Sequence, residues 1–268
     1  MPVSSARSRA RLLARQGRAA GIAPALVCPL ILAQAAEIEA RPAQRFLTDP
    51  TKLANGLRAL QGAFGTDVIV TAAADDLAAC AAGLGNEPVT GHPRVAAAVE
   101  ATRRLAATAE DAALAAALCG PASLAAQLGR SPADPDAMEQ CGGVLLALAK
   151  AFLEAGAHLL LVVEAGPLPA QAVDGWRSAV TPLINVARFR QAAAAVVLAD
   201  PADAARVPRG AVVCLPPSAA SPGQGIALGT DPAAWQSPPH GVPLVTTLGP
   251  VQGGFAECRA AVAELAEA

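Results

Sequence analysis

The chain has 268 residues, of which 53% are hydrophobic and 16% are charged, so it can bury a large core and is not a disordered protein. Its net charge is −2, and aromatic residues make up 3% with no tyrosine, which argues against a surface for nucleic acid. The longest apolar run, residues 22–36, contains two prolines and is too short to span a bilayer, so we expect no membrane contact.

The start of the chain is rich in arginine, at Arg7, Arg9, Arg11, Arg15 and Arg18. No apolar segment with a small-residue cleavage site accompanies them, so a secretory signal is not supported. We predict an amphipathic first helix, with an organelle transit peptide as the alternative. The six cysteines are scattered without a Cys-x-x-Cys pair, which favours a reducing, cytoplasmic compartment over a disulfide framework.

Eight short apolar runs follow one another along the chain, each ending at a small, acidic or turn-forming residue. They cover residues 23–28, 67–71, 113–119, 158–164, 193–200, 211–215, 225–229 and 243–248. Runs such as 159–163 are continuously apolar, as expected of parallel strands that are buried on both faces. A barrel or a doubly wound sheet would bury them in this way.

Alanine-rich stretches with helical character separate most of these runs. Those we expect to be helices include residues 50–64, 93–107, 122–128, 137–155 and 255–268. Asp49-Pro50 is a strong helix start, because Asp49 can cap the free N–H groups while Pro50 occupies the first turn. The alternation predicts an α/β chain, and the count of eight strands favours a (β/α)₈ barrel that spans residues 1–268 as a single domain.

The last third of the chain departs from this alternation. Residues 216–223 and 231–241 are short and rich in proline, serine and glycine, so full helices do not fit there. We therefore predict reduced helices after the sixth and seventh strands. The outer faces of those strands would be open or covered by a partner chain.

Five segments carry a resemblance to known proteins. They are residues 46–50 (FLTDP), 64–70 (FGTDVIV), 120–125 (GPASLA), 154–158 (EAGAH) and 227–232 (ALGTDP). In this order and spacing they resemble the uroporphyrinogen decarboxylase superfamily, which includes corrinoid methyltransferases. The resemblance implies a (β/α)₈ barrel, in agreement with the strand count.

The resemblance also places the family's catalytic aspartate at Asp76, ahead of Leu84-Gly85, with Asp75 beside it. Barrel enzymes place their chemistry at the carboxyl ends of the strands, here called the mouth. Two adjacent carboxylates there repel one another, which can raise one pKa into a useful range for acid–base work. The alternative is that one of the two caps the following helix and the other is solvated.

Other positions of the decarboxylase pattern are not matched. The arginine-bearing stretch expected after the first strand is replaced by apolar residues 29–32, and no late histidine stands near residues 249–250. The family tyrosine falls at Gln127 and the family serine at Ala165, beside a retained Glu164. Uroporphyrinogen decarboxylation is therefore not expected, while Glu164 is kept as a third catalytic candidate.

The metal site of the methyltransferase branch is also missing. In that branch a His-x-Cys pair after the fifth strand and a cysteine near the last strand bind zinc. Here residues 197–200, at the end of the fifth strand, contain neither histidine nor cysteine. Cys258 is near the position of the late cysteine but falls inside the last predicted helix. We predict no cofactor. If the protein does bind one, zinc and a corrinoid are the candidates. Cys28, Cys119 and Cys214 each end a predicted strand and are weak metal candidates, against the alternative that they pack as small apolar groups.

Acidic residues at other strand ends complete the predicted site. Asp200, Asp231, Gln127 and His240 are the substrate-binding candidates. Asp200 and Asp231, together with Glu164 and Asp76, would make the mouth acidic, which favours a cationic ligand or a hard metal ion. The alternative is that the acids cap helices or turns and that His240 lies in a surface loop.

Two further arginines, Arg188 and Arg190, could bind a carboxylate or phosphate. They precede the fifth strand and so lie away from the mouth, which favours solvation or salt bridges instead.

The sequence thus predicts a divergent family member that acts on a small or tetrapyrrole-related molecule, as a lyase of the decarboxylase type or by methyl transfer. The alternative is a catalytically inactive barrel that binds a corrinoid, a porphyrin or a protein partner, and a homodimer and a corrinoid protein are the candidate assemblies.

Overall fold

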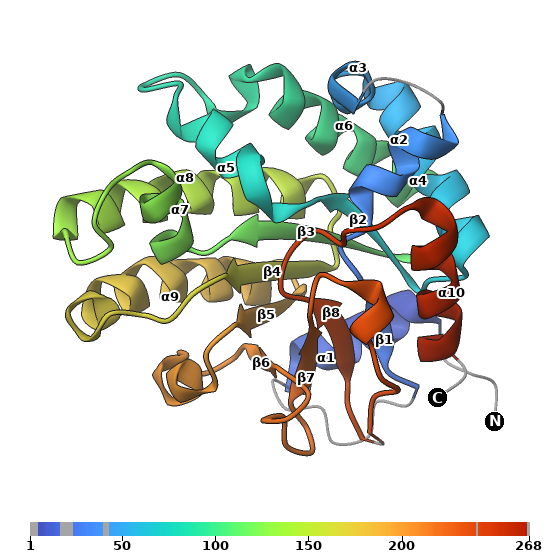
Figure 1. Cartoon of the computed structure of the whole chain (residues 1–268). Coiled ribbons are helices and arrows are strands. Elements are labelled where there is room, and N and C mark those ends of the chain that lie inside the picture. The colour runs from blue at the N-terminus through green and yellow to red at the C-terminus, as the bar shows by residue number, and fades with distance from the viewer. Residues whose placement is uncertain (1–4, 17–23, 40–42, 240, 267–268) are drawn as a thin grey trace.

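The computed structural model describes residues 5–16, 24–39, 43–239 and 241–266, with only the backbone for residues 16, 43, 44, 74–76 and 266. Eight strands form its centre (Figure 1). They are β1 (Leu26–Cys28), β2 (Val68–Ala72), β3 (Ala113–Cys119), β4 (Leu159–Glu164), β5 (Ala193–Leu198), β6 (Val212–Leu215), β7 (Gly225–Leu228) and β8 (Leu244–Thr247). Each lies on one of the eight predicted runs.

All neighbouring strands are parallel, in the order β1-β8-β7-β6-β5-β4-β3-β2. β1 and β2 stand at the two ends of this order and also contact one another. The sheet is therefore a nearly closed (β/α)₈ barrel, which confirms the predicted fold class. Nearly every strand residue is buried, because the barrel interior covers one face of each strand and the outer layer covers the other.

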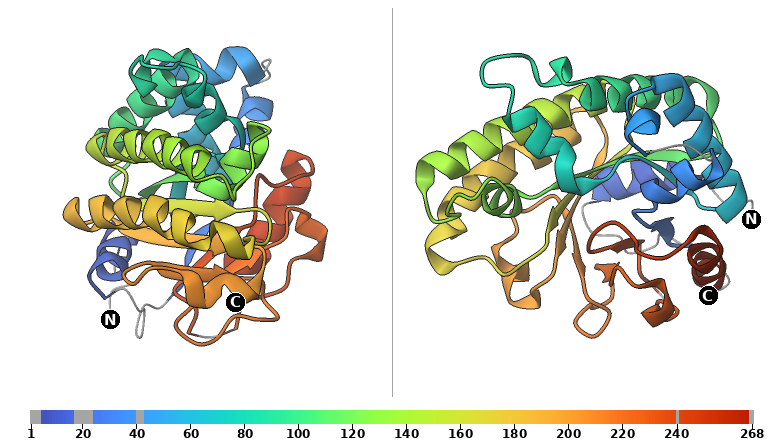
Figure 2. Two further views of the ribbon diagram at one scale, coloured as in Figure 1. Left: turned by 90° about the vertical axis from the view of Figure 1, so that its left-hand side faces the viewer. Right: turned by 45° about the horizontal axis from the view of Figure 1, so that its top comes forward.

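Helices surround the first five strands (Figures 1 and 2). The α-helices are α1 (Ala6–Gln16), α2 (Leu32–Ile38), α3 (Ala43–Leu47), α4 (Pro50–Phe64), α5 (Ala74–Ala82), α6 (Pro93–Thr108), α7 (Pro121–Gln127), α8 (Pro135–Glu154), α9 (Val173–Phe189) and α10 (Phe255–Ala266). Asp49 caps α4 as predicted, since its Oδ1 accepts from the N–H groups of Thr51 and Lys52.

The outer layer is thin in the last third of the chain, shown in orange in Figure 2. The loop between β6 and β7 contains no helix, and only the short 3₁₀ helix η4 (Pro232–Ala234) lies between β7 and β8 in the described residues. This confirms the reduced helices predicted there. The thinning begins one strand earlier, because β5 is followed only by the 3₁₀ helix η3 (Pro201–Arg206). Pro208 holds the preceding Val207 in an extended conformation, which ends η3.

Helix α1 closes the amino end of the barrel, where it contacts β1, β3 and β5. Its Ala10 is fully buried, and Arg7 donates to three carbonyls, one in the last turn of α6 and two between α6 and β3. Arg9, 4% exposed, donates to two carbonyls just ahead of β1 and pairs with Asp67. The predicted first helix is confirmed, and two of its arginines hold the fold together; Arg18 lies outside the described residues. In the part of the chain that the structure describes, no helix combines the length and the apolar character needed to cross a membrane.

Candidate functional site at the barrel mouth

The mouth begins at the end of β2. The pairing of β2 with β3 is irregular between Val70 and Ala72, so Thr71 lies at a bulge, a feature that often re-aims a strand beside an active site. The Thr71 hydroxyl donates to the Ala115 carbonyl at 3.2 Å and accepts from Thr102 at 2.7 Å. These buried bonds fix the strand end from which α5 departs.

Asp75 and Asp76 follow this bulge in the first turn of α5. Their backbone is described, whereas their side chains lie outside the described part of the structure. The residue at the cap position of α5 is Ala73, which offers no side-chain hydrogen bond. The two predicted catalytic aspartates are thus at the mouth and at a helix N-terminus, where the partial positive charge of the helix favours a carboxylate.

The space beside these residues is small. A hollow of about 20 Å³ is lined in part by Thr71, Ala73, Leu77 and Arg94. That volume holds about one water molecule. Leu53 of α4 and Ala98 of α6 also line it, so the hollow lies between the end of β2 and the outer helices and is too small for an organic reactant.

Glu164, the third catalytic candidate, is the last residue of β4 and is 1% exposed. Its carboxylate accepts four hydrogen bonds. Oε1 accepts from the Ala122 N–H at 3.1 Å and from Trp176 Nε1 at 2.7 Å. Oε2 accepts from the Ser123 N–H at 2.9 Å and from the Ser123 hydroxyl at 2.6 Å.

These bonds join β4, which carries Glu164, to α7 and α9, which carry the donors. Gly120 makes the arrangement possible, since a Cβ at that position would overlap the Glu164 carboxylate. Burial raises the pKa of Glu164, and the hydrogen bonds from Ser123, Trp176 and Ala122 oppose that rise. The observed contacts are those of a buried helix cap; a catalytic role for Glu164 stays a prediction.

Two predicted substrate-binding acids also make capping contacts. Asp200 precedes η3 and accepts from the Ala202 N–H at 2.9 Å, and the exposed Asp231 precedes η4 and accepts from the Ala233 N–H at 3.0 Å. Each acid caps a short helix that begins with proline. Both acids therefore cap helices, which is the alternative that the sequence left open. Contact of either acid with a substrate stays a prediction.

The structure gives less information on the two remaining substrate-binding candidates, Gln127 and His240. Gln127 is the exposed last residue of α7. His240 lies outside the described residues.

The strand-end cysteines are buried. Burial raises the pKa of Cys28, and the charge of a Cys214 thiolate would raise it further. Burial raises the pKa of Cys214 to about 12, and its Sγ occupies the space that a Cβ of Gly225 would need. The described residues bring together no group of three or more His, Cys, Asp or Glu side chains able to hold a metal. The structure therefore places Cys28, Cys119 and Cys214 in the core and offers no support for a metal cluster among them.

Sequence reasoning missed the polar contacts that hold the β1–β8 side of the mouth. The Thr247 hydroxyl accepts from the Leu30 N–H at 3.1 Å and donates to the Gly249 carbonyl at 2.7 Å. Thr246 donates to the Cys28 carbonyl at 2.9 Å. The adjacent threonines at the end of a predicted strand were the available signal.

The fold and the mouth define a (β/α)₈ barrel whose mouth places two aspartates at the start of a helix. No protein-family model matches the chain, and no curated protein sequence matches it. Among solved structures, a methyltransferase from Methanosarcina mazei is similar in fold, with a TM-score of 0.68 and 12% identity over 98% of both chains.

Two other barrels are similar as well. A proposed vitamin-B12-independent methionine synthase from Listeria monocytogenes has a TM-score of 0.57 and 12% identity over 93% of this chain and 98% of its own. The homocysteine methyltransferase from Escherichia coli has a TM-score of 0.55 and 16% identity over 91% of this chain and 95% of its own. The barrel implied by the resemblance to the uroporphyrinogen decarboxylase superfamily is confirmed, and the chain shares its fold with methyltransferases.

Proposed function

We propose that this chain is a divergent member of the uroporphyrinogen decarboxylase-like superfamily that transfers a methyl group to a small acceptor at the barrel mouth. The observation that supports this most is the similarity in fold to a methyltransferase over 98% of both chains. Fold alone does not determine function, so the proposal also rests on Asp75 and Asp76 at the start of α5.

Two of the similar barrels are named for methionine synthesis or homocysteine methylation, which suggests a thiol as the acceptor. A positively charged methyl donor, such as a sulfonium or quaternary ammonium compound, suits the acidic pair. In the transfer the sulfur–carbon bond forms as the donor–carbon bond breaks, and the electron pair of the broken bond stays on the donor, which becomes neutral. The thiol proton passes to Asp76, with Asp75 as the neighbouring charge.

The zinc of the methyltransferase branch does not fit this chain. β5 ends at Leu198 and is followed by Ala199 and Asp200, without a histidine or cysteine. The late Cys258 lies in α10, where its thiol accepts from Gln34 Nε2 at 3.5 Å. Thiol activation in this proposal therefore depends on a carboxylate and not on zinc. A corrinoid is kept as a candidate donor or ligand.

The decarboxylase route has less support. Apolar residues 29–32 stand where arginines would bind the substrate carboxylates. The second candidate function is an inactive barrel that binds a corrinoid, a porphyrin or a protein partner. It is favoured by the capping contacts of Glu164, Asp200 and Asp231, which leave fewer carboxylates for chemistry.

We place the protein in the reducing cytoplasm, which suits its six free cysteines. A homodimer in which a second copy covers the thin outer layer after β6 and β7 is part of this proposal.

The test begins with thermal shift, since a ligand that binds the folded state raises Tm by mass action. The panel contains small thiols, sulfonium and quaternary ammonium donors, cobalamins, porphyrinogens and divalent metals. Methyl transfer between the ligands that bind is then measured with Asp76→Asn and with Asp136→Asn, an acid in the first turn of α8, as the matched control.

Loss of transfer in Asp76→Asn, with ligand binding retained and the control active, would support the proposal. Equal activity in Asp76→Asn and the parent protein would refute the role of Asp76. Binding without any transfer would favour the inactive barrel.

A further inference from the structure

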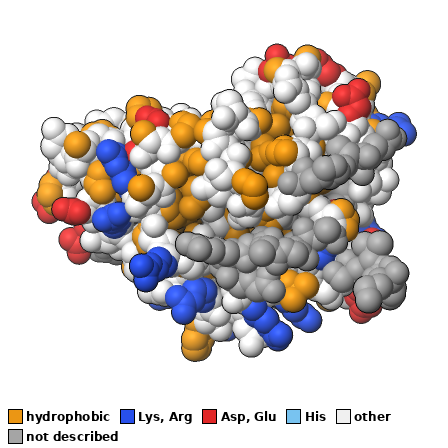
Figure 3. Space-filling model, turned by 90° about the horizontal axis from the view of Figure 1, so that it is seen from below, with side chains coloured by type: hydrophobic (Ala, Val, Ile, Leu, Met, Phe, Trp, Pro, Cys, Tyr) orange, Lys and Arg blue, Asp and Glu red, His pale blue; other side chains and the backbone are white. Residues whose placement is uncertain are grey.

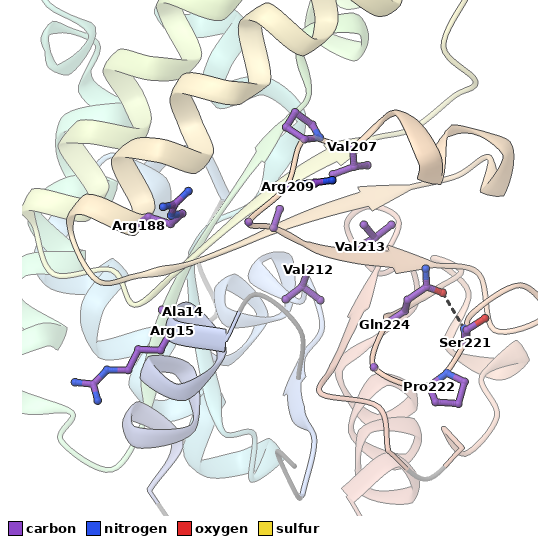
Figure 4. Close-up of a pocket in the computed structure, with 14 residues that line it drawn as sticks. Ala14, Arg15, Arg188, Val207, Arg209, Val212, Val213, Ser221, Pro222 and Gln224 are labelled. Atoms are coloured by element: carbon purple, nitrogen blue, oxygen red, sulfur yellow. Dashed lines mark hydrogen bonds between the residues drawn. The ribbon is translucent and has the colours of Figure 1, made fainter. Parts of the chain in front are cut away.

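A pocket of about 910 Å³ lies at the end of the barrel opposite to the mouth (Figure 4). Its walls come from the end of α1, the end of α9 and the turns that lead into β6 and β7. Because these turns precede the strands, the pocket belongs to the amino end of the barrel. It is separate from Asp75, Asp76 and the mouth.

Three arginines line this pocket: Arg15 from α1, Arg188 from α9 and Arg209 from the turn before β6. All three are exposed. Within the described chain, none of their side chains makes a hydrogen bond or ion pair, and no acidic side chain lines the pocket. Their positive charges are therefore not neutralised by any of the residues that the structure describes.

Neighbouring arginines differ in this respect. Arg190 pairs with Glu154 at 2.6 Å, and Arg206 pairs with Asp203 at 2.6 Å. Solvation or salt bridging was expected for Arg188 and Arg190; Arg190 forms a salt bridge, whereas Arg188 is exposed to solvent. The Arg188 side chain lies close to Gly210, which adopts φ +99° and where an added Cβ would lie 3.2 Å from Arg188 Cδ. Gly210 leaves room for the Arg188 side chain along the pocket wall.

The rest of the lining is apolar or neutral. Val207 and Val212 contribute apolar side chains, while Ser221 and Gln224 contribute polar ones. Gln224 Oε1 accepts from the Ser221 N–H at 2.8 Å, so its amide nitrogen is available as a donor. The pocket therefore combines positive charge with an apolar surface.

Positive charge is a property of this end of the molecule, although the chain as a whole has a net charge of −2. Lys and Arg side chains gather on the face shown in Figure 3, and the acidic side chains visible there lie toward its margins. His158 is at the amino end of β4, where burial and then the charges of Arg7 and Arg11 lower its pKa to about 4. A local field of this kind attracts anions.

We propose that this pocket binds a small organic molecule that carries two or more negative charges, as phosphate or carboxylate groups, together with an apolar portion. Guanidinium groups bind both kinds of oxyanion through paired, charge-assisted hydrogen bonds. The valines then contact the apolar portion. The volume is in the range of ordinary small-molecule sites.

The test is calorimetric titration of the full chain with pyrophosphate, citrate and a nucleoside triphosphate as separate probes. Pyrophosphate and citrate distinguish phosphate from carboxylate, and the nucleotide adds an apolar ring system. We expect at least one probe to bind, with an affinity that falls as ionic strength rises. Arg188→Gln and Arg209→Gln should each weaken it about tenfold, the loss expected for one charge-assisted contact.

Arg259→Gln removes an exposed arginine from α10, away from the pocket, and is the matched control. Gln224→Glu keeps the acceptor for Ser221 but adds a negative charge, so it should also weaken binding. Because it does not remove an arginine, it tests the pocket even if an arginine variant fails to fold.

No binding of any probe to the parent protein, or equal losses in Arg188→Gln and Arg259→Gln, would overturn the proposal. Asp76→Asn should leave this binding unchanged, which separates it from the proposed activity at the mouth.

Discussion

The two ends of the barrel differ in whether their charged side chains have hydrogen-bond or ion-pair partners within the protein. At the mouth, Glu164, Asp200 and Asp231 bind backbone N–H groups, so much of the acidic character predicted from the sequence serves to hold helices in place. At the amino end, Arg7 and Arg9 are also structural, but the arginines of the pocket have no protein partner among the described residues. A charged residue near a strand end is therefore best judged by whether its charge is already satisfied.

The largest effect should come from removing the buried cap. Glu164→Ala leaves four donors without their acceptor, including the buried Trp176 Nε1, and should lower the free energy of unfolding by about 3–5 kcal/mol. Urea denaturation measures this. Glu154→Ala, which removes an exposed ion-paired glutamate, is the control and should cost about 1 kcal/mol or less. If Glu164→Ala is as stable as this control but inactive, Glu164 is a catalytic residue and the capping interpretation is wrong.

The second comparison lies within α1. Arg9→Ala removes a buried guanidinium that pairs with Asp67 and should destabilise the protein by about 2–3 kcal/mol. Arg15→Ala removes an exposed arginine without a partner and should change stability by less than about 0.5 kcal/mol. Thermal and urea unfolding measure both. Similar losses in the two variants would contradict the division between structural and pocket arginines.

A smaller effect is expected at the exposed caps. Asp231→Ala should cost about 1 kcal/mol, because the Ala233 N–H loses its acceptor, while Asp231→Asn should cost less, since asparagine also caps. Unfolding midpoints give the ranking. If both variants keep full stability and lose ligand binding at the mouth, Asp231 contacts the substrate.

The last prediction concerns pH. The pKa of His158 is lowered to about 4 in the folded protein, below the usual value near 6.5, so the unfolded chain binds more protons between these two values. Stability should therefore rise as pH increases from about 4 to 6.5 and then level off with respect to this group. His158→Asn keeps an acceptor near the Leu114 N–H, which His158 Nδ1 binds at 3.2 Å, and should flatten this part of the curve. An unchanged slope in the variant would contradict the assignment to His158.

Local patterns in the sequence predicted the fold well. Each apolar run became a strand, and Asp49-Pro50 began α4, because these features depend on neighbouring residues. The role of Glu164 was not predictable, since its donors are 41 residues before it and 12 residues after it. The pocket likewise joins Arg15 to Arg209, which only the closed barrel brings to one wall.

The closure of the barrel has a consequence for biosynthesis. β1 pairs with β8, and the bond from Thr246 to the Cys28 carbonyl joins residues 218 positions apart. During translation the first strand therefore lacks this neighbour until about 218 further residues have been synthesised. Long-range parallel pairing of this kind slows folding and leaves an open strand edge in the meantime. Nascent chains that stop before β8 should therefore be more dependent on chaperones than the finished protein.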